Sequence, residues 1–224
     1  MNPPPGKRVF IMAQPISYLE EIKRKAVHLS SLWMVAVTIA LPRFVPYGRW
    51  YAVAIFTVCA AVTLVSEHDY ANGGKYLGKL YGKLFGKMLR SEVTPGQWIV
   101  SGGAPVLFAA VLVNLLFPPA IAAASLAVML TGDAAAALCG RKFGRHKIVN
   151  GKSLEGTLSF VVVGFLFLSI VGAICAQGKW FYLAGAAATI LAAVVELFTA
   201  QLKIDDNFTI PVTVGVILSS TLLF

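Results

Sequence analysis

Long apolar runs alternate with short polar segments along most of the chain. Seven of these runs approach or exceed the roughly 17 to 20 helical residues that cross a bilayer core of about 30 Å, and the first of them is marginal in length. They occupy roughly residues 26–41, 50–66, 98–117, 119–139, 157–176, 181–202 and 208–224. Pro118 and Pro119 leave almost no loop between the third and fourth runs, so these two are expected to form a tight hairpin. The pattern predicts an all-α, polytopic membrane helix bundle with about seven transmembrane helices.

The composition excludes an ordinary soluble domain. Of the 224 residues, 58% are hydrophobic and only 13% are charged, and the mean hydropathy is +0.76. Buried core helices of a large soluble protein would need more polar chain to cover them than this sequence contains. The chain is therefore expected to be an integral membrane protein.

One polar segment is a short internal repeat. Residues 74–89 consist of four tetrads, each with glycine and lysine followed by two apolar residues. At 100° per residue the lysines form one stripe and the apolar residues lie opposite, which predicts an interfacial amphipathic helix. Each glycine costs about 1 kcal/mol of helix stability, so this helix should depend on docking to lipid or to the bundle. The lysines either attract anionic lipid or CTP, or serve only as a positive anchor beside close-packing glycines; the second interpretation is favoured for any one lysine.

The basic residues are distributed unevenly between the two predicted sides. With the N-terminus inside, all of the 19 lysines and arginines except Arg43, Arg49 and Lys179 fall on the cytoplasmic side. This asymmetry predicts a multi-pass protein of the cell (inner, cytoplasmic) membrane with a cytoplasmic N-terminus. Residues 1–15, with four prolines, are expected to form a flexible tail ahead of a single membrane-embedded catalytic domain at 16–224. The net charge of +9 fits attraction to anionic membrane lipids and to nucleotide phosphates; nucleic acid is not an expected partner, because no groove-reading module is recognisable.

Four sets of polar residues fall on this same side. They are Glu21, Arg24, Lys25 and His28; Asp133 with Arg141 and Arg145; Lys152, Ser153 and Glu155; and Glu196 with Asp205, Asp206 and Asn207. A charged group at the centre of a membrane helix costs roughly 2.5 to 3.5 kcal/mol, so Asp133 and Glu196 are expected to have a chemical task. Each lies six residues before the end of its predicted span, which places both about 9 Å inside the cytoplasmic boundary.

Two carboxylates at one depth suit a divalent cation or a general base. Mg²⁺ is the natural candidate, because it uses one or two carboxylates and completes its shell with water and substrate phosphates. The alternative is that each acid pairs with an inward-facing lysine or arginine.

The Gly151-Lys152-Ser153 segment resembles the end of a P-loop, but the spacing fails, because His146 occupies the position of the required first glycine. Ser153 can still cap the following helix, whose N-terminus attracts phosphate, with Lys152 as a point charge. No Ser/His/Asp set, thiol nucleophile or histidine-rich metal site is evident in the sequence, which disfavours hydrolytic and redox chemistry.

The four sets form motifs in a specific order. These are Glu21-x-x-Arg24-Lys25-x-x-His28; Gly132-Asp133-x-x-Ala136 with Gly140-Arg141 and Gly144; Lys152-Ser153-x-Glu155-Gly156-x-x-x-Phe160; and Glu196 with Asp205-Asp206-Asn207 and Pro211. Together they resemble the polyprenol (dolichol) kinase, phytol kinase and CTP-dependent diacylglycerol kinase family, which is related to phosphatidate cytidylyltransferases. The resemblance extends from about Glu20 to the C-terminus.

The resemblance implies a membrane kinase that transfers the γ-phosphate of a nucleotide, commonly CTP, to a lipid alcohol such as a polyprenol, a phytol-like alcohol or diacylglycerol. The expected catalytic residues are Asp133, Glu196 and Lys152. The expected nucleotide-binding residues are Lys25, His28, Arg141, Arg145, Lys152, Ser153 and Asn207. The expected ligands of Mg²⁺ are Asp133, Glu155, Glu196 and Asp206. The alternatives are a CTP:phosphatidate cytidylyltransferase and, in a different class, a transporter or lipid-binding membrane protein.

Overall fold

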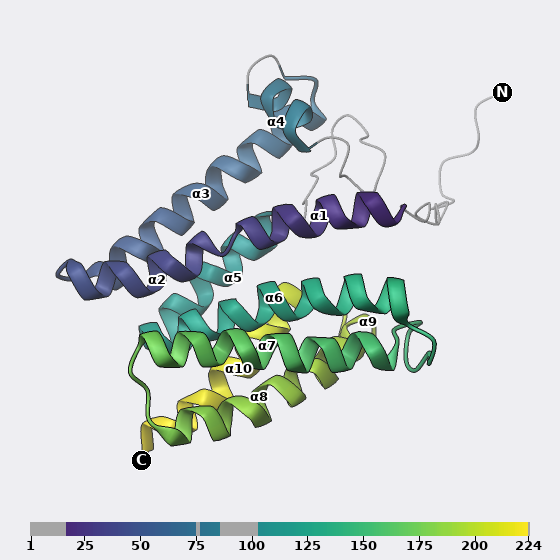
Figure 1. Ribbon diagram of the computed structural model, residues 1–224. Coiled ribbons are helices and arrows are strands. Elements are labelled where there is room, and N and C mark those ends of the chain that lie inside the picture. The colour runs from purple at the N-terminus through teal and green to yellow at the C-terminus, as the bar shows by residue number, and fades with distance from the viewer. Residues whose placement is uncertain (1–16, 75–76, 86–102, 224) are drawn as a thin grey trace.

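The computed structural model describes residues 17–74, 77–85 and 103–223 (Figure 1). Its helices are α1 (Tyr18–Ser30), α2 (Trp33–Phe44), α3 (Gly48–Ala71), α4 (Leu77–Phe85), α5 (Gly103–Leu116), α6 (Pro119–Phe143), α7 (Leu154–Ile174), α8 (Lys179–Leu197), α9 (Thr199–Leu202), α10 (Asp206–Ser219) and the 3-10 helix η2 (Ser220–Leu223). The expected tail at 1–15, the start of the third expected span and parts of the 74–89 repeat lie outside the described residues. Within them no β-strand forms, and the one isolated bridge joins Lys147 to Ser153.

The predicted all-α membrane bundle is confirmed. In the described part of the chain, six helical stretches are long and apolar enough to cross a membrane, and α5 adds a shorter apolar helix. The first run, which is marginal in the sequence, belongs to a stretch of 27 residues, Tyr18–Phe44, that bends between α1 and α2. This stretch begins early because Ser17 and Glu20 form a capping box: the Ser17 hydroxyl accepts from Glu20 N, and Ser17 N donates to the Glu20 carboxylate.

Helix α6 is the centre of the molecule. Every residue from 121 to 132 is buried, and α6 packs against α1, α2, α5, α7 and α10. Many of these buried residues are alanines. Small side chains allow helix backbones to approach closely, which is how membrane helices gain packing energy without a hydrophobic driving force between them.

The predicted hairpin between α5 and α6 is also present, with Pro118 preceding α6 and Pro119 as its first residue. Arg49, near the start of α3, donates to the carbonyl oxygens of Asn114 and Leu115 at 2.6 Å each. The last carbonyls of a helix have no partner within the helix, so this side chain satisfies the end of α5 at the hairpin.

The outer surface of the bundle is apolar. On α7 the exposed large side chains recur every fourth residue: Leu158, Val162, Leu166, Ile170 and Ile174. A stripe of this kind along a helix of 21 residues suits contact with lipid chains.

Helices α6 and α7 touch through glycines near the polar end. A Cβ added at Gly156 would lie 2.9 Å from the Ala136 carbonyl oxygen and 3.2 Å from Gly140 Cα, both of which are backbone atoms.

We expect Gly156→Ala to force the two helices apart and to lower the free energy of unfolding by about 1–3 kcal/mol, the usual cost of overpacking. The matched control is Gly178→Ala, because an added Cβ there meets nothing within 4 Å. Thermal unfolding in detergent measures the difference. Equal melting temperatures for both variants would show that the α6–α7 contact tolerates a methyl group.

Candidate active site

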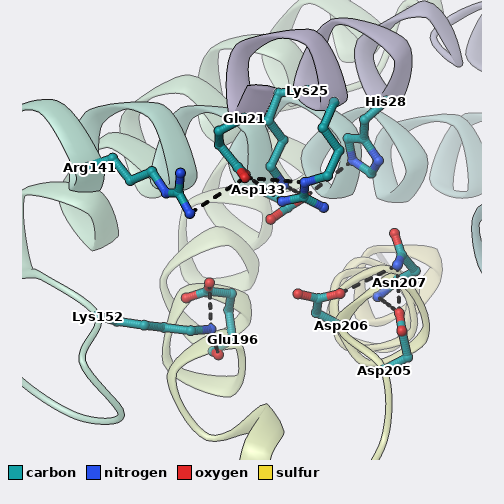
Figure 2. Close-up of polar contacts among 11 residues, drawn as sticks. Glu21, Lys25, His28, Asp133, Arg141, Lys152, Glu196, Asp205, Asp206 and Asn207 are labelled. Atoms are coloured by element: carbon teal, nitrogen blue, oxygen red, sulfur yellow. Dashed lines mark hydrogen bonds and ion pairs between the residues drawn. The ribbon is translucent and has the colours of Figure 1, made fainter. Parts of the chain in front are cut away.

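The polar ends of the helices gather at one end of the bundle. In Figure 1 the start of α1, the end of α6 and the start of α7 lie together on the right, beside α9. Figure 2 shows their side chains around a common space: Lys25, His28 and Asp133 on one side, with the Lys152–Glu196 pair and Asp206 facing them. All four polar sets found in the sequence therefore contribute to one region.

Helix α1 presents one polar face to α6. Glu21, Lys25 and His28 are spaced at i, i+4 and i+7, so they share a face of the helix. The residues Glu21 and Lys25 are each only 2% exposed. A lysine this deeply buried needs a partner for its charge, since an unpaired buried charge is strongly unfavourable.

That partner is Asp133 on α6. Lys25 Nζ donates to Asp133 Oδ2, and His28 Nε2 lies 3.3 Å from the same oxygen. The Asp133 side chain keeps 15% of its surface exposed, so it is reachable although both its neighbours are mostly buried.

The Glu21 carboxylate contacts two arginines, Arg24 and Arg141. Arg24 Nε donates to Glu21 Oε2 at 3.3 Å, and Arg141 Nη2 lies 3.8 Å from that oxygen. Arg141 also donates to the Ser17 carbonyl oxygen at 3.4 Å, which ties the end of α6 to the start of α1. Two guanidinium groups on one carboxylate leave a net positive charge, and the side chains of Arg24 and Arg141 are 31% and 38% exposed.

Glu21 and Arg24 are quoted in the first motif but are absent from the expected binding residues. Their spacing of three residues on one helix could have indicated that Glu21 and Arg24 form an ion pair beside the other site residues.

A second ion pair joins the loop before α7 to the end of α8. Lys152 Nζ lies 2.6 Å from Glu196 Oε1 and also donates to the Glu196 carbonyl oxygen. Glu196 is only 6% exposed, so a charge there would be unfavourable without a partner. Lys152 is that partner, as Lys25 is for Asp133.

Asn150 fixes this loop and was not identified from the sequence. Its amide donates to the Leu197 carbonyl oxygen at 2.7 Å and to Gln201 Oε1 at 2.8 Å. Asn150 and Gly151 both have left-handed backbones, with φ of 55° and 74°. Asparagine and glycine tolerate this conformation best, so the Asn150-Gly151 pair was the available signal for a tight turn beside Lys152.

Ser153 and Glu155 have local partners. The Ser153 hydroxyl accepts from Gly156 N at 3.2 Å, so it caps α7 as expected, and it is buried. The Glu155 carboxylate accepts from His146 N at 3.2 Å and lies 2.8 Å from His146 Nδ1. No described contact joins Glu155 to the other three expected metal ligands. Arg145 is exposed at the surface.

The start of α10 contributes Asp206 to the region. Asp205 caps the helix by accepting from Asn207 N at 2.9 Å, which leaves Asp206 facing the other groups (Figure 2). Asp206 lies within electrostatic range of Asp133, Lys25 and Lys152, yet among the described residues it forms no ion pair. Its one hydrogen bond there, from Asn207 Nδ2, is long at 3.4 Å.

The structure corrects the prediction that Asp133 and Glu196 lie equally far from the ends of their helices. Asp133 lies ten residues before the end of α6, whereas Glu196 is the second-last residue of α8. The predicted spans ended at 139 and 202, but α6 continues to Phe143 and α8 stops at Leu197, where a turn at Phe198 leads into α9. The two carboxylates still lie within electrostatic range of each other.

The buried acids adopt the alternative considered from the sequence, in which each pairs with a basic residue. Among the described residues, no three His, Cys, Asp or Glu side chains lie close enough to hold a metal ion by themselves. Mg²⁺ does not require such a cage, since it keeps several waters and binds through one or two carboxylates plus phosphates. Asp206 forms no ion pair among the described residues and lies within electrostatic range of Asp133, so it is the carboxylate of this region that such a mode could use.

Comparison with known proteins gives little further information. A protein of Rickettsia prowazekii (strain Madrid E), described only as uncharacterized, is 28% identical over 200 residues, which cover 86% of this chain and 90% of the relative. No family model matches the chain. No solved structure matches it either. The family resemblance therefore rests on the four sequence motifs alone.

Proposed function

We propose that the protein is a membrane kinase that transfers the γ-phosphate of CTP to the hydroxyl of a lipid alcohol. One observation carries the proposal: three carboxylates and two lysines from α1, α6, α8, α10 and the loop before α7 face one space at the polar end of an apolar bundle (Figure 2). Charged groups in such a position are expensive, so they favour a chemical role over a structural one. The Mg²⁺ requirement and the cytoplasmic side of the site belong to the same proposal.

The basic groups suit the triphosphate. The side chains of Arg24, Arg141 and Lys152 are all partly exposed, at 31%, 38% and 30%. Phosphoryl transfer depends mainly on positioning and charge neutralisation, which these cations supply. Mg²⁺, when bound by Asp206 and Asp133, would add neutralisation of the phosphate charge.

The carboxylates suit the acceptor. The tail of the alcohol would lie among lipid chains against the bundle, and its hydroxyl would reach the exposed part of Asp133. The hydroxyl oxygen would then bond to the γ-phosphorus, the bond from that phosphorus to the bridging oxygen would break, and CDP would leave. Asp133 would accept the hydroxyl proton if it does not hold Mg²⁺, and Glu196 would accept it otherwise, while Lys25 holds Asp133 in place.

The proposal is tested by incubating the purified protein with γ-labelled CTP or ATP and a broad lipid extract, followed by mass analysis of the whole lipid fraction and measurement of the label in it. We expect label in a lipid monophosphate. Lipid carrying CMP would identify a cytidylyltransferase instead. No transfer with any nucleotide would favour a transporter or lipid-binding protein.

The proposed orientation makes a separate prediction. Within the described residues, six long apolar helices and α5 would give seven crossings, so with this count a cytoplasmic N-terminus requires an external C-terminus. A reporter fused after Phe224 should therefore be active only outside the cytoplasmic membrane, and one fused to the N-terminus only inside. A cytoplasmic C-terminal reporter would mean that α5 does not cross.

A further inference from the structure

Helix α4 is held against the end of α3 by specific contacts. The Tyr81 hydroxyl donates to Glu67 Oε1 at 3.2 Å, and Gly78 N donates to Asp69 Oδ2 at 2.7 Å. The rings of Tyr70 and Tyr81 lie 5.8 Å apart. A Cβ at Gly78 or Gly82 would overlap Tyr70, so these glycines are needed for close packing. One face of α4 is therefore committed to the protein, which supports the close-packing interpretation of the glycines.

The rest of α4 divides into two separate faces. At 100° per residue, Leu77, Leu80 and Leu84 lie within about 60° of one another, and Lys79 and Lys83 lie about 40° apart on a neighbouring arc. The three leucines are 46–56% exposed, and both lysines are exposed. Exposed leucines grouped on one arc are unfavourable in water, so this face requires an apolar environment.

We propose that α4 docks onto the surface of an anionic bilayer, with its leucines among the acyl chains and its lysines on the lipid phosphates. Helix α4 follows α3, which is long and apolar enough to cross the membrane, so it lies where that membrane ends. Adjacent apolar and basic arcs match the two layers of such a boundary, acyl chains beside negative headgroups. A helix of nine residues with two internal glycines has little stability of its own, so its order depends on Tyr81, Gly78 and lipid together.

The charge contribution sets the expected effect. A lysine near an anionic membrane surface strengthens docking by about fivefold, and two lysines by about 25-fold at low salt. The effect should decrease as salt rises, because the groups are exposed.

The docking of α4 onto anionic lipid is tested by hydrogen exchange of the 77–85 amides. The protein is placed in nanodiscs of phosphatidylcholine, alone or mixed with phosphatidylglycerol. We expect slower exchange when phosphatidylglycerol is present, and loss of that difference in Lys79→Gln/Lys83→Gln. The matched control is Lys142→Gln/Lys147→Gln, which removes two exposed lysines elsewhere and should keep the difference. Leu80→Gln should speed exchange in both lipids.

Unchanged exchange of the 67–71 amides in each variant shows that the end of α3 remains folded. The proposal is overturned if the native protein exchanges equally in both lipids, or if the phosphatidylglycerol effect survives loss of both lysines. Protection that depends on protein concentration instead of lipid would identify a second copy of the chain as the occupant.

Discussion

Replacing Asp133 by asparagine should destabilise the protein by about 3–5 kcal/mol, because Lys25 would keep a buried charge without its partner. Lys25 is 2% exposed and donates directly to Asp133. The double variant Lys25→Met/Asp133→Asn should recover most of this loss, since replacing both members of a buried pair by neutral groups is often neutral or stabilising. Thermal unfolding in detergent measures both variants.

Activity should respond differently from stability. If Asp133 orients or deprotonates the acceptor, the double variant should fold well and still transfer phosphate at least about a hundredfold more slowly, the usual lower effect of a positioned acid-base group. A stable double variant with near-normal turnover would make the Lys25–Asp133 pair structural. A stable, active Asp133→Asn variant would contradict both parts of the prediction.

Replacing Lys152 by glutamine should lower the rate of phosphate transfer by about 100- to 1,000-fold, the usual effect of removing one stabilising group from a transition state. Its Nζ pairs with the Glu196 carboxylate and donates to the Glu196 carbonyl oxygen, to which the Thr199 hydroxyl also donates at 3.1 Å. Thr199 has no positive charge, so it does not replace the charge of Lys152. The loss of stability should be smaller than for Asp133→Asn, because the Lys152 side chain is 30% exposed whereas that of Lys25 is 3% exposed, so the Lys152–Glu196 pair is less completely removed from water.

Lys147→Gln is the matched control for this variant, since Lys147 is an exposed lysine of the same loop. Its turnover should stay near that of the native protein, as measured by initial rates at several CTP concentrations. A raised KM with unchanged kcat in Lys152→Gln would show that Lys152 only binds nucleotide and does not stabilise the transition state.

The fold could be predicted because apolar runs of membrane length leave few alternatives. The hairpin at Pro118 and the cap at Ser153 followed from local rules in the same way. The ends of α6 and α8 did not follow from local rules. Contacts from distant residues occur at both ends: Arg141 near the end of α6 donates to the Ser17 carbonyl oxygen, and Asn150 donates to the Leu197 carbonyl oxygen at the end of α8. The start of α1 at Tyr18 could have been predicted from the capping box of Ser17 and Glu20, but it was missed because the first span was placed by its apolar residues alone.

The sequence singled out residues of all four polar sets that the structure brings to one region, but it did not predict the contacts between them. Lys25 and Asp133 are 108 residues apart, so no local spacing reveals that they pair. The sequence indicated only that a buried Asp133 should have either a chemical role or a basic partner, and the structure identifies Lys25 as the partner. Glu67 illustrates the same limit: it is fully buried on α3 and was not singled out, because its partner Tyr81 lies on a different helix.

The most direct test of the proposed kinase activity uses CTP with separate labels on its α- and γ-phosphates, incubated with the protein, Mg²⁺ and a lipid extract. We predict that the lipid product carries the γ-label and none of the α-label, and that the folded Lys25→Met/Asp133→Asn protein forms almost none of it. A lipid product that carries the α-label, or a lipid fraction that carries neither label, would contradict the proposal that this protein phosphorylates a lipid alcohol.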